Sequence, residues 1–90
     1  MKDNLTQSAF EFPCSFPLKV FGEVADDFEE IVLSIVSRHV EQLEAGTVSS
    51  RKSSGGKYLC VTVTIDAQSQ DQLDNLYMEL GGHDRVLMLL

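Results

Sequence analysis

Apolar and polar residues alternate strictly from Lys57 to Asp66, and a few residues later the spacing becomes helical. The alternation is typical of a β-strand with one buried face, because successive side chains of a strand point to opposite sides. Ser69, with Gln72 three residues on, has the pattern of a capping box at a helix start. The apolar residues that follow recur at the spacing of one helix face: Leu73, Leu76, Tyr77 and Leu80.

The same change of spacing occurs earlier in the chain. Ser15–Gly22 predicts a first strand, and we expect regular pairing to begin just after Pro17 because proline has no N–H to donate. Asp26 followed by Glu29 resembles another capping box, and an apolar stripe predicts a helix that ends near Gly46. The stripe consists of Phe28, Ile31, Val32, Ile35, Val36, His39, Val40 and Leu43.

The remaining segments complete a β-α-β-β-α-β order. Thr47–Ser54 predicts a polar edge strand or a partly disordered arm, Gly55-Gly56 a tight hairpin turn and Arg85–Leu90 a last strand. This order predicts an α+β, ferredoxin-like sandwich with two helices on one face of a four-stranded antiparallel sheet, in which the first and third strands are central. The domain is expected to cover residues 12–90, after a flexible N-terminal tail over residues 1–11.

One core is expected between the helices and the sheet. It should contain the strand and helix positions that share a buried face, which are Leu18, Val20, Phe28, Ile31, Val32, Ile35, Leu59, Val61, Val63, Ile65, Leu73, Leu76, Tyr77 and Leu80.

Composition narrows the setting of the protein. Cys14 and Cys60 lie far apart without a CxxC spacing or a pair of flanking histidines, which favours free thiols in a reducing cytoplasm over a disulfide or a zinc site. The longest apolar run, Val86–Leu90, is too short to span a membrane, and the first residues lack the apolar region of a signal peptide. We therefore expect a cytoplasmic protein.

Charge is the other informative property. Asp and Glu number 14 against 7 Lys and Arg, for a formal charge of −7 at pH 7. This balance makes nucleic acid an unlikely partner, because non-specific affinity depends on cations that neutralise phosphates. Arg51, Lys52 and Lys57 nevertheless cluster around the hairpin turn and form a candidate surface for a protein partner. The alternative is a solvated edge strand whose charges prevent aggregation.

A set of short motifs in one register resembles the YbeD-like family of small bacterial proteins. In order, the motifs are Glu11-Phe12-Pro13, Phe16, Lys19-Val20, Gly22, Arg38-His39, Ser53-Ser54, Gly56, Tyr58, Leu73, Tyr77, Glu79-Leu80, Val86, Met88 and Leu90. The resemblance implies a ferredoxin-like domain similar to ACT-type regulatory domains, a bacterial cytoplasmic setting and no established catalytic residues. Relatives can carry Ala-Pro where this chain has Val40-Glu41, so we expect its first helix to run longer.

Two further surfaces are candidates for binding. Gly22 precedes the first helix, where backbone N–H groups suit a carboxylate, so it marks a candidate ligand cleft; the acidic residues nearby oppose an anion. The last strand is expected to be an edge that is apolar on both faces. It forms a candidate homodimer edge made of Val86, Leu87, Met88, Leu89 and Leu90. The alternative is that this segment folds back onto Phe12, Phe16 or Phe21.

Together these patterns favour a non-enzymatic regulatory or adaptor domain that binds a protein and, following the ACT-like resemblance, a small molecule. No catalytic residue, cofactor or metal site is predicted, because the clustered carboxylates are explained by the dipole of the first helix. The alternative is an RNA-binding domain that stacks bases on Phe21 and Tyr58 of the open sheet face; a minor enzyme is a third. For His39, a packed side chain and a pH-sensitive contact both stay open.

Overall fold

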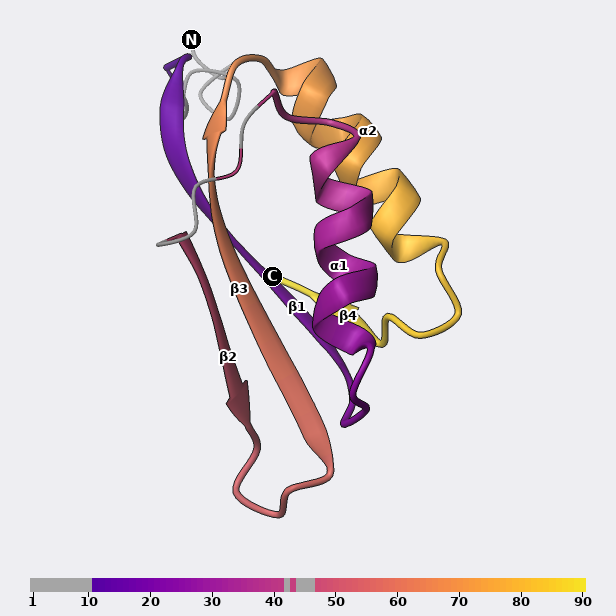
Figure 1. Cartoon of the computed structure of the whole chain (residues 1–90). Helices are drawn as coiled ribbons and strands as arrows, with labels where there is room; N and C mark the ends of the chain where they lie inside the picture. Colours follow the sequence, from indigo (N-terminus) through magenta and orange to yellow (C-terminus); the bar gives the residue numbers. More distant parts are fainter. Residues whose placement is uncertain (1–10, 42, 44–46) are drawn as a thin grey trace, which may run out of the picture.

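A computed structural model describes residues 11–41, 43 and 47–90. Six elements follow in chain order: β1 (Cys14–Glu23), α1 (Phe28–Ser37), β2 (Val48–Lys52), β3 (Tyr58–Ala67), α2 (Gln70–Gly81) and β4 (Met88–Leu89). This is the predicted β-α-β-β-α-β order (Figure 1). The tail predicted over residues 1–11 lies, apart from Glu11, outside the described residues, and so does the predicted helix end at Gly46.

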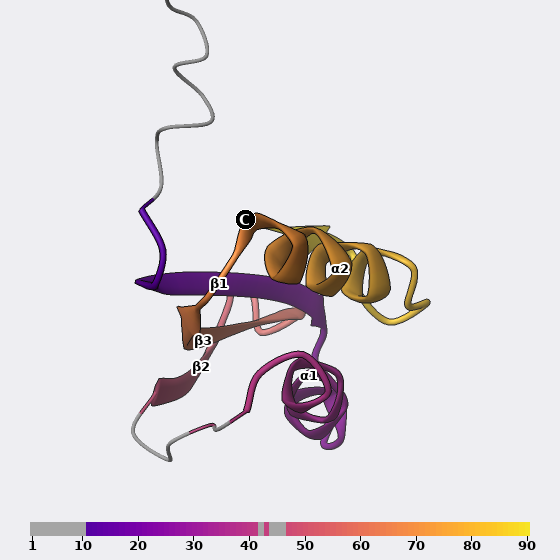
Figure 2. The same cartoon turned by 90° about the horizontal axis from the view of Figure 1, so that it is seen from above.

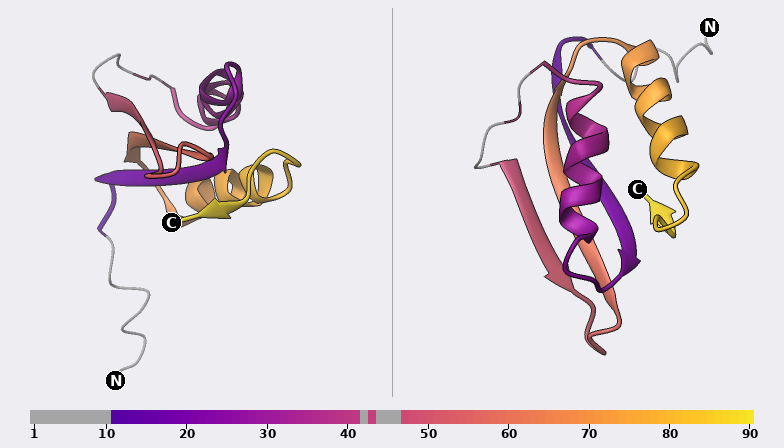
Figure 3. Two further views of the ribbon diagram at one scale, coloured as in Figure 1. Left: turned by 90° about the horizontal axis from the view of Figure 1, so that it is seen from below. Right: turned by 45° about the vertical axis from the view of Figure 1, so that its right-hand side comes forward.

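The four strands form one antiparallel sheet in the order β2-β3-β1-β4. β1 and β3 are the central strands, as predicted, and they pair along their whole length from Cys14↔Ala67 to Glu23↔Tyr58. β2 and β4 are the edges, and β4 pairs with β1 only over a short stretch. Both helices lie on the same side of the twisted sheet, to the right of the long strands in Figure 1; Figures 2 and 3 show them from above, from below and with the right-hand side of Figure 1 brought forward. The ferredoxin-like prediction is confirmed.

The apolar core fills the space between the two layers. Its buried members are Leu18, Val20, Phe28, Val32, Ile35, Val36, Val61, Val63, Ile65, Ala67, Leu73, Leu76 and Leu80. Three residues expected in the core, Ile31, Leu59 and Tyr77, are only partly buried and pack against it. The alternation along β3 therefore identified the correct face of the sheet, since its odd-numbered residues from Val61 to Ala67 are buried.

Pairing of β1 begins before Pro17, so the expectation that it starts after the proline is wrong. Lys19 exchanges hydrogen bonds with Leu90, which shows that the backbone groups of this residue face β4. The backbone groups of Pro17, two residues away, therefore also point toward the β4 side of β1, while those of Leu18 between them bond to β3. The missing N–H of Pro17 leaves the β1–β3 ladder complete.

Both predictions for the ends of α1 are wrong. The N-cap residue is Asp27 rather than Asp26, and it makes no side-chain capping bond. At the other end the helix stops at Ser37, well before the predicted end and without the extension expected from Val40-Glu41. The carbonyl oxygen of His39 accepts a hydrogen bond from the side chain of Gln72 at 2.8 Å. This partner on α2 replaces the bond that a continuing helix would supply.

The start of α2 agrees with its sequence signal. The backbone N–H of Gln72 donates to the hydroxyl of Ser69, 3.1 Å away. The side chain of Gln72 accepts from the N–H of Gln68, not from that of Ser69 as in a full capping box. Ser69 is therefore the N-cap of α2, as predicted.

The last strand is shorter than the predicted Arg85–Leu90, since regular strand covers only Met88–Leu89. Single hydrogen bonds extend its contact with β1: the N–H of Leu87 donates to the carbonyl oxygen of Phe21 at 2.7 Å. Arg85 belongs to the preceding turn instead, where its guanidinium donates to Asp27. That ion pair connects the turn before β4 to the start of α1.

Candidate functional site

The basic hairpin, residues 51–57, joins β2 to β3 at the far end of the sheet (Figure 1). Its turn closes through two backbone hydrogen bonds of 2.8 Å, from Ser53 to Tyr58 and from Gly56 to Ser53. Gly56 has φ 74°, in the left-handed region that favours glycine. The local sequence therefore folds as the tight turn that Gly55-Gly56 predicts.

Strand register separates the three cations of the basic hairpin. Arg51 pairs with Cys60, so it lies on the open face, whereas Lys52 pairs with Leu59 on the face that carries the helices. The ammonium group of Lys57 lies 5.5 Å from the ring centroid of Tyr58. The three charges thus surround the hairpin on both sides of the sheet, and a partner contacting them all must approach its edge or tip.

The sequence around these cations contains no acidic residue. The segment from Thr47 to Ile65 contains no Asp or Glu, although the chain has 14 acidic residues. All three are exposed, and within the described residues no carboxylate forms an ion pair with them. Arg38 and Arg85, by contrast, each bind a carboxylate of a distant segment. The basic hairpin therefore presents uncompensated positive charge on an acidic protein.

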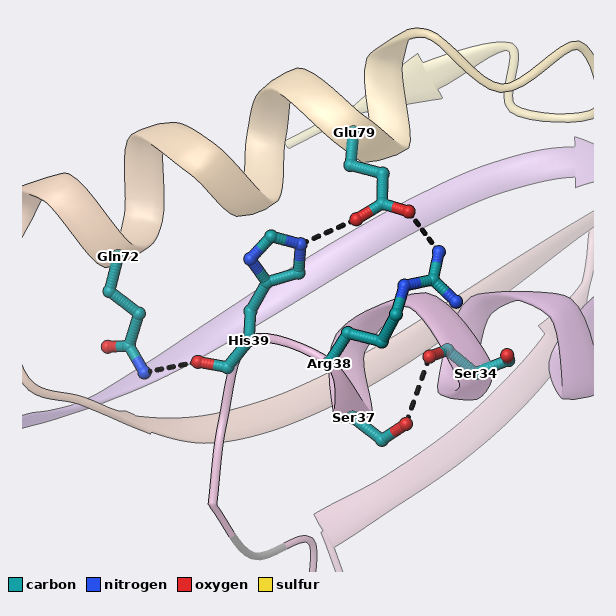
Figure 4. A network of polar contacts seen from close by, with 6 residues as sticks. All are labelled: Ser34, Ser37, Arg38, His39, Gln72 and Glu79. Carbon is teal, nitrogen blue, oxygen red and sulfur yellow. Dashed lines mark hydrogen bonds and ion pairs between the residues drawn. The ribbon is translucent and has the colours of Figure 1, made fainter.

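A second polar cluster joins the end of α1 to α2 (Figure 4). The carboxylate of Glu79 accepts from the guanidinium of Arg38 with one oxygen and from Nε2 of His39, at 2.6 Å, with the other. The Arg38 guanidinium, followed by the hydrogen bond from His39, holds the pKa of Glu79 below its usual value. His39 therefore serves as a contact between the helices, with its Nε2 carrying the proton because a carboxylate can only accept.

An open depression of about 850 Å³ lies beside this cluster. Arg38, His39 and Gln72 border it from the helices, and Thr64 and Asp66 border it from β3. Arg38 and His39 both contact Glu79, so the guanidinium at the border of the depression is already paired with a carboxylate of the protein. No set of His, Cys, Asp and Glu in the described parts of the chain is grouped so as to hold a metal ion.

Gly22 lies where β1 turns toward α1. A Cβ atom there would lie 2.5 Å from the ring of Phe28 and 2.6 Å from the carbonyl oxygen of Arg85. Protein atoms therefore fill the place where the sequence suggested a ligand cleft. Glycine is required at this position for close packing.

The candidate dimer edge is divided between exposed and packed side chains. Leu87, Met88 and Leu90 are 56%, 51% and 61% exposed. Val86 and Leu89 pack against the core instead, and Leu89 approaches α2 at Gly81. This edge therefore offers a few apolar side chains and one short stretch of backbone. A homodimer through it stays a prediction.

The open sheet face carries the two aromatic residues of the RNA-binding alternative. Phe21 is partly buried and Tyr58 is 40% exposed, so both rings reach this face. Glu23 lies directly opposite Tyr58 in the β1–β3 register and places an acidic side chain beside it. That carboxylate disfavours a phosphate backbone at this point of the sheet.

Sequence reasoning missed Glu79 and Arg85 as partners. Arg38-His39 and Glu79-Leu80 both belong to the family motifs, and a basic and an acidic motif in two successive predicted helices are the signal that indicates their pairing. Nothing local marks Arg85 as the partner of Asp27, because the two are 58 residues apart.

Among the residues that the structure describes, neither the length nor the apolar content of any helix suffices to span a membrane.

Comparison with protein families places the chain. Residues 7–90 match the family described as Protein of unknown function (DUF493). The chain belongs to this family. A UPF0250 protein of Chromobacterium violaceum is 46% identical over 93% of this chain and 94% of its own length. A UPF0250 protein of Paraburkholderia phytofirmans is 40% identical over 97% and 98%. The resemblance to the YbeD-like bacterial proteins is confirmed, and neither description names an enzymatic activity.

A solved structure supports the same fold. The solution structure of protein HP0495 from H. pylori matches with a TM-score of 0.76 and covers 100% of this chain and 94% of its own. Its sequence identity to this chain is 12%. At that identity the likeness shows a shared fold alone.

Proposed function

We propose that the chain is a non-enzymatic adaptor or regulatory domain whose basic hairpin binds an acidic segment of a partner protein. The observation that carries this proposal is the uncompensated charge of Arg51, Lys52 and Lys57. Charges of opposite sign on a partner are attracted over several ångströms and orient its approach. The remaining chain is acidic and repels the same partner elsewhere, which confines contact to the hairpin.

The other polar groups support a role without catalysis. Asp27 and Glu79 have lowered pKa values, chiefly because each carboxylate accepts a hydrogen bond from a guanidinium, that of Arg85 for Asp27 and that of Arg38 for Glu79. A general acid or base needs a pKa near the working pH, and these shifts move the carboxylates away from it. We propose no small-molecule ligand at Gly22, because the ring of Phe28 and the carbonyl oxygen of Arg85 occupy the space beside it.

Quantitative affinity capture tests the proposal. Replacing Arg51, Lys52 and Lys57 together by Gln should remove the main partner from material captured from a lysate of a bacterium that encodes the chain. Capture by the wild type should also weaken as salt rises, since salt screens exposed charges. Circular dichroism should be unchanged, because exposed charges contribute little to stability.

A matched variant controls for net charge. Gln70→Glu, Asn75→Glu and Met78→Glu on the exposed side of α2 lower the net charge by the same amount without touching the hairpin. This variant should capture the partner as the wild type does. Equal capture by all three proteins overturns the proposal and leaves the hairpin as a solvated edge.

A further inference from the structure

The outer edge of β2 has backbone groups that no other strand uses. β2 comes first in the sheet order, so β3 is its single neighbour among the described strands. Ser53 donates to Tyr58, which makes this a hydrogen-bonded pair. Because such pairs alternate along an antiparallel ladder, Ser49 and Arg51 also bond to β3. The N–H and C=O groups of Val48, Ser50 and Lys52 therefore point outward.

This edge is bounded by charges of both signs. Arg51 stands on the open face and Lys52 on the helix side, both close to the hairpin turn. Farther from the turn, the hydroxyl of Ser50 donates to the carboxylate of Glu29 on α1 at 2.5 Å. The hairpin end of β2 thus carries positive charge, and the next position on the helix side, Ser50, carries a bound carboxylate.

We propose that the acidic partner segment binds as an additional strand along the outer edge of β2; this inference rests on the proposed function. An extended segment placed there takes up the outward N–H and C=O groups, as in strand addition to other sheet edges. Its acidic side chains lie on the open face, opposite Arg51, and its uncharged side chains lie on the helix side, opposite Ser50 and the Glu29 carboxylate bound to it. The recognised chemistry is therefore an extended peptide that alternates acidic and β-forming residues.

The charge argument selects this partner over a second copy of the chain. A second β2 edge adds further cations and no acidic side chain, whichever way the two strands run, so it leaves Arg51 and Lys52 without a compensating charge. Cations on an edge strand also disfavour pairing between copies of the same protein along that edge. An acidic strand instead compensates Arg51 and at the same time satisfies the outward backbone groups of β2.

Two fluorescein-labelled peptides of equal charge separate strand addition from simple charge attraction. One alternates Glu with Val, and the other alternates Glu with Pro, which has no N–H and cannot pair as a strand. In anisotropy titrations the wild type should bind the Glu–Val peptide about tenfold more tightly, as expected for lost backbone hydrogen bonds. Equal affinity for the two peptides, or no binding of the Glu–Val peptide at millimolar concentration, overturns strand addition.

Ser50→Pro supplies the matching change in the protein. It removes one outward N–H and keeps the ladder to β3, a position where edge strands tolerate proline. It should weaken the Glu–Val peptide about tenfold, whereas Ser50→Ala, which removes only the hydroxyl bonded to Glu29, should bind as the wild type does. Thermal unfolding verifies that Ser50→Pro folds. A folded Ser50→Pro protein with unchanged affinity overturns strand addition.

The two proposals fail in different ways. If both peptides bind equally and the Arg51, Lys52 and Lys57 to Gln variant loses both, the hairpin binds acidic segments by charge alone and the proposed function stands. If that variant binds the Glu–Val peptide unchanged, both proposals fail. Sedimentation equilibrium without peptide detects pairing of two copies, and a dimer abolished by Ser50→Pro overturns the choice of an acidic partner.

Discussion

The two helices pack against one core, yet their ends are held in different ways. α2 begins at Ser69, whose hydroxyl accepts from the N–H of Gln72 three residues on. α1 has no such local bond at its start: Asp27 is bound by Arg85, 58 residues away, and beyond its end Arg38 contacts Glu79, 41 residues away. A helix end can therefore be fixed by near neighbours or by the tertiary structure, and only the first leaves a short motif.

The largest loss of stability should come from core substitutions and should be similar for the two helices. Ile35→Ala in α1 and Leu76→Ala in α2 should each lower the free energy of unfolding by about 2–5 kcal/mol, because both side chains are buried in the shared core. Met78→Ala, at a position that is 71% exposed, is the control and should change it by less than about 0.5 kcal/mol. Denaturant titration measures all three. A cost near that of the control for either core variant would break the equivalence.

The next effect should distinguish the helix starts. Ser69→Ala removes the local cap of α2 and should cost about 1 kcal/mol, whereas Ser69→Asp, which can still accept the bond, should retain most of the stability. At the start of α1, Asp27→Ala removes an exposed ion pair, so its effect should be smaller than that of Ser69→Ala. If Asp27→Ala lowered the free energy of unfolding more than Ser69→Ala in denaturant titrations, the side chain of Asp27 would have to cap α1.

The smallest effect should appear in the pH dependence of the α1–α2 contact. The pKa of Glu79 is lowered in the folded protein, mainly by Arg38. Its stabilising contribution is therefore present above the usual carboxyl pKa and is lost as the pH falls through the lowered value. Melting temperatures of the wild type and of Glu79→Gln should differ at neutral pH and converge in acid. Arg38→Gln should show the same convergence, and a constant difference would contradict this assignment.

The sequence predicted those parts of the fold that depend on local pattern. The alternation over Lys57–Asp66 identified β3 and its buried face, and Ser69 identified the start of α2. The end of α1 was not predictable, because the apolar spacing continues to Leu43 and the residues that interrupt the helix, Gln72 and Glu79, lie on α2.

The candidate site was predictable in position and only partly in arrangement. The clustering of Arg51, Lys52 and Lys57 is visible in the sequence, and so is the absence of acidic residues from Thr47 to Ile65. The sequence does not show that Arg38 and Arg85 have carboxylate partners, whereas these three form no ion pair with any residue that the structure describes. That contrast depends on tertiary contacts.

The close approach of Phe28 to Gly22 has a consequence for how this chain can vary. The two positions share one volume, since a methyl group on Gly22 would overlap the ring of Phe28. Substitution of Gly22 should be rejected in a deep mutational scan, and a smaller residue at position 28 should not make alanine acceptable, because the carbonyl oxygen of Arg85 lies 2.6 Å from the same Cβ position. Among family members, glycine at this corner is then expected to be retained even where position 28 varies.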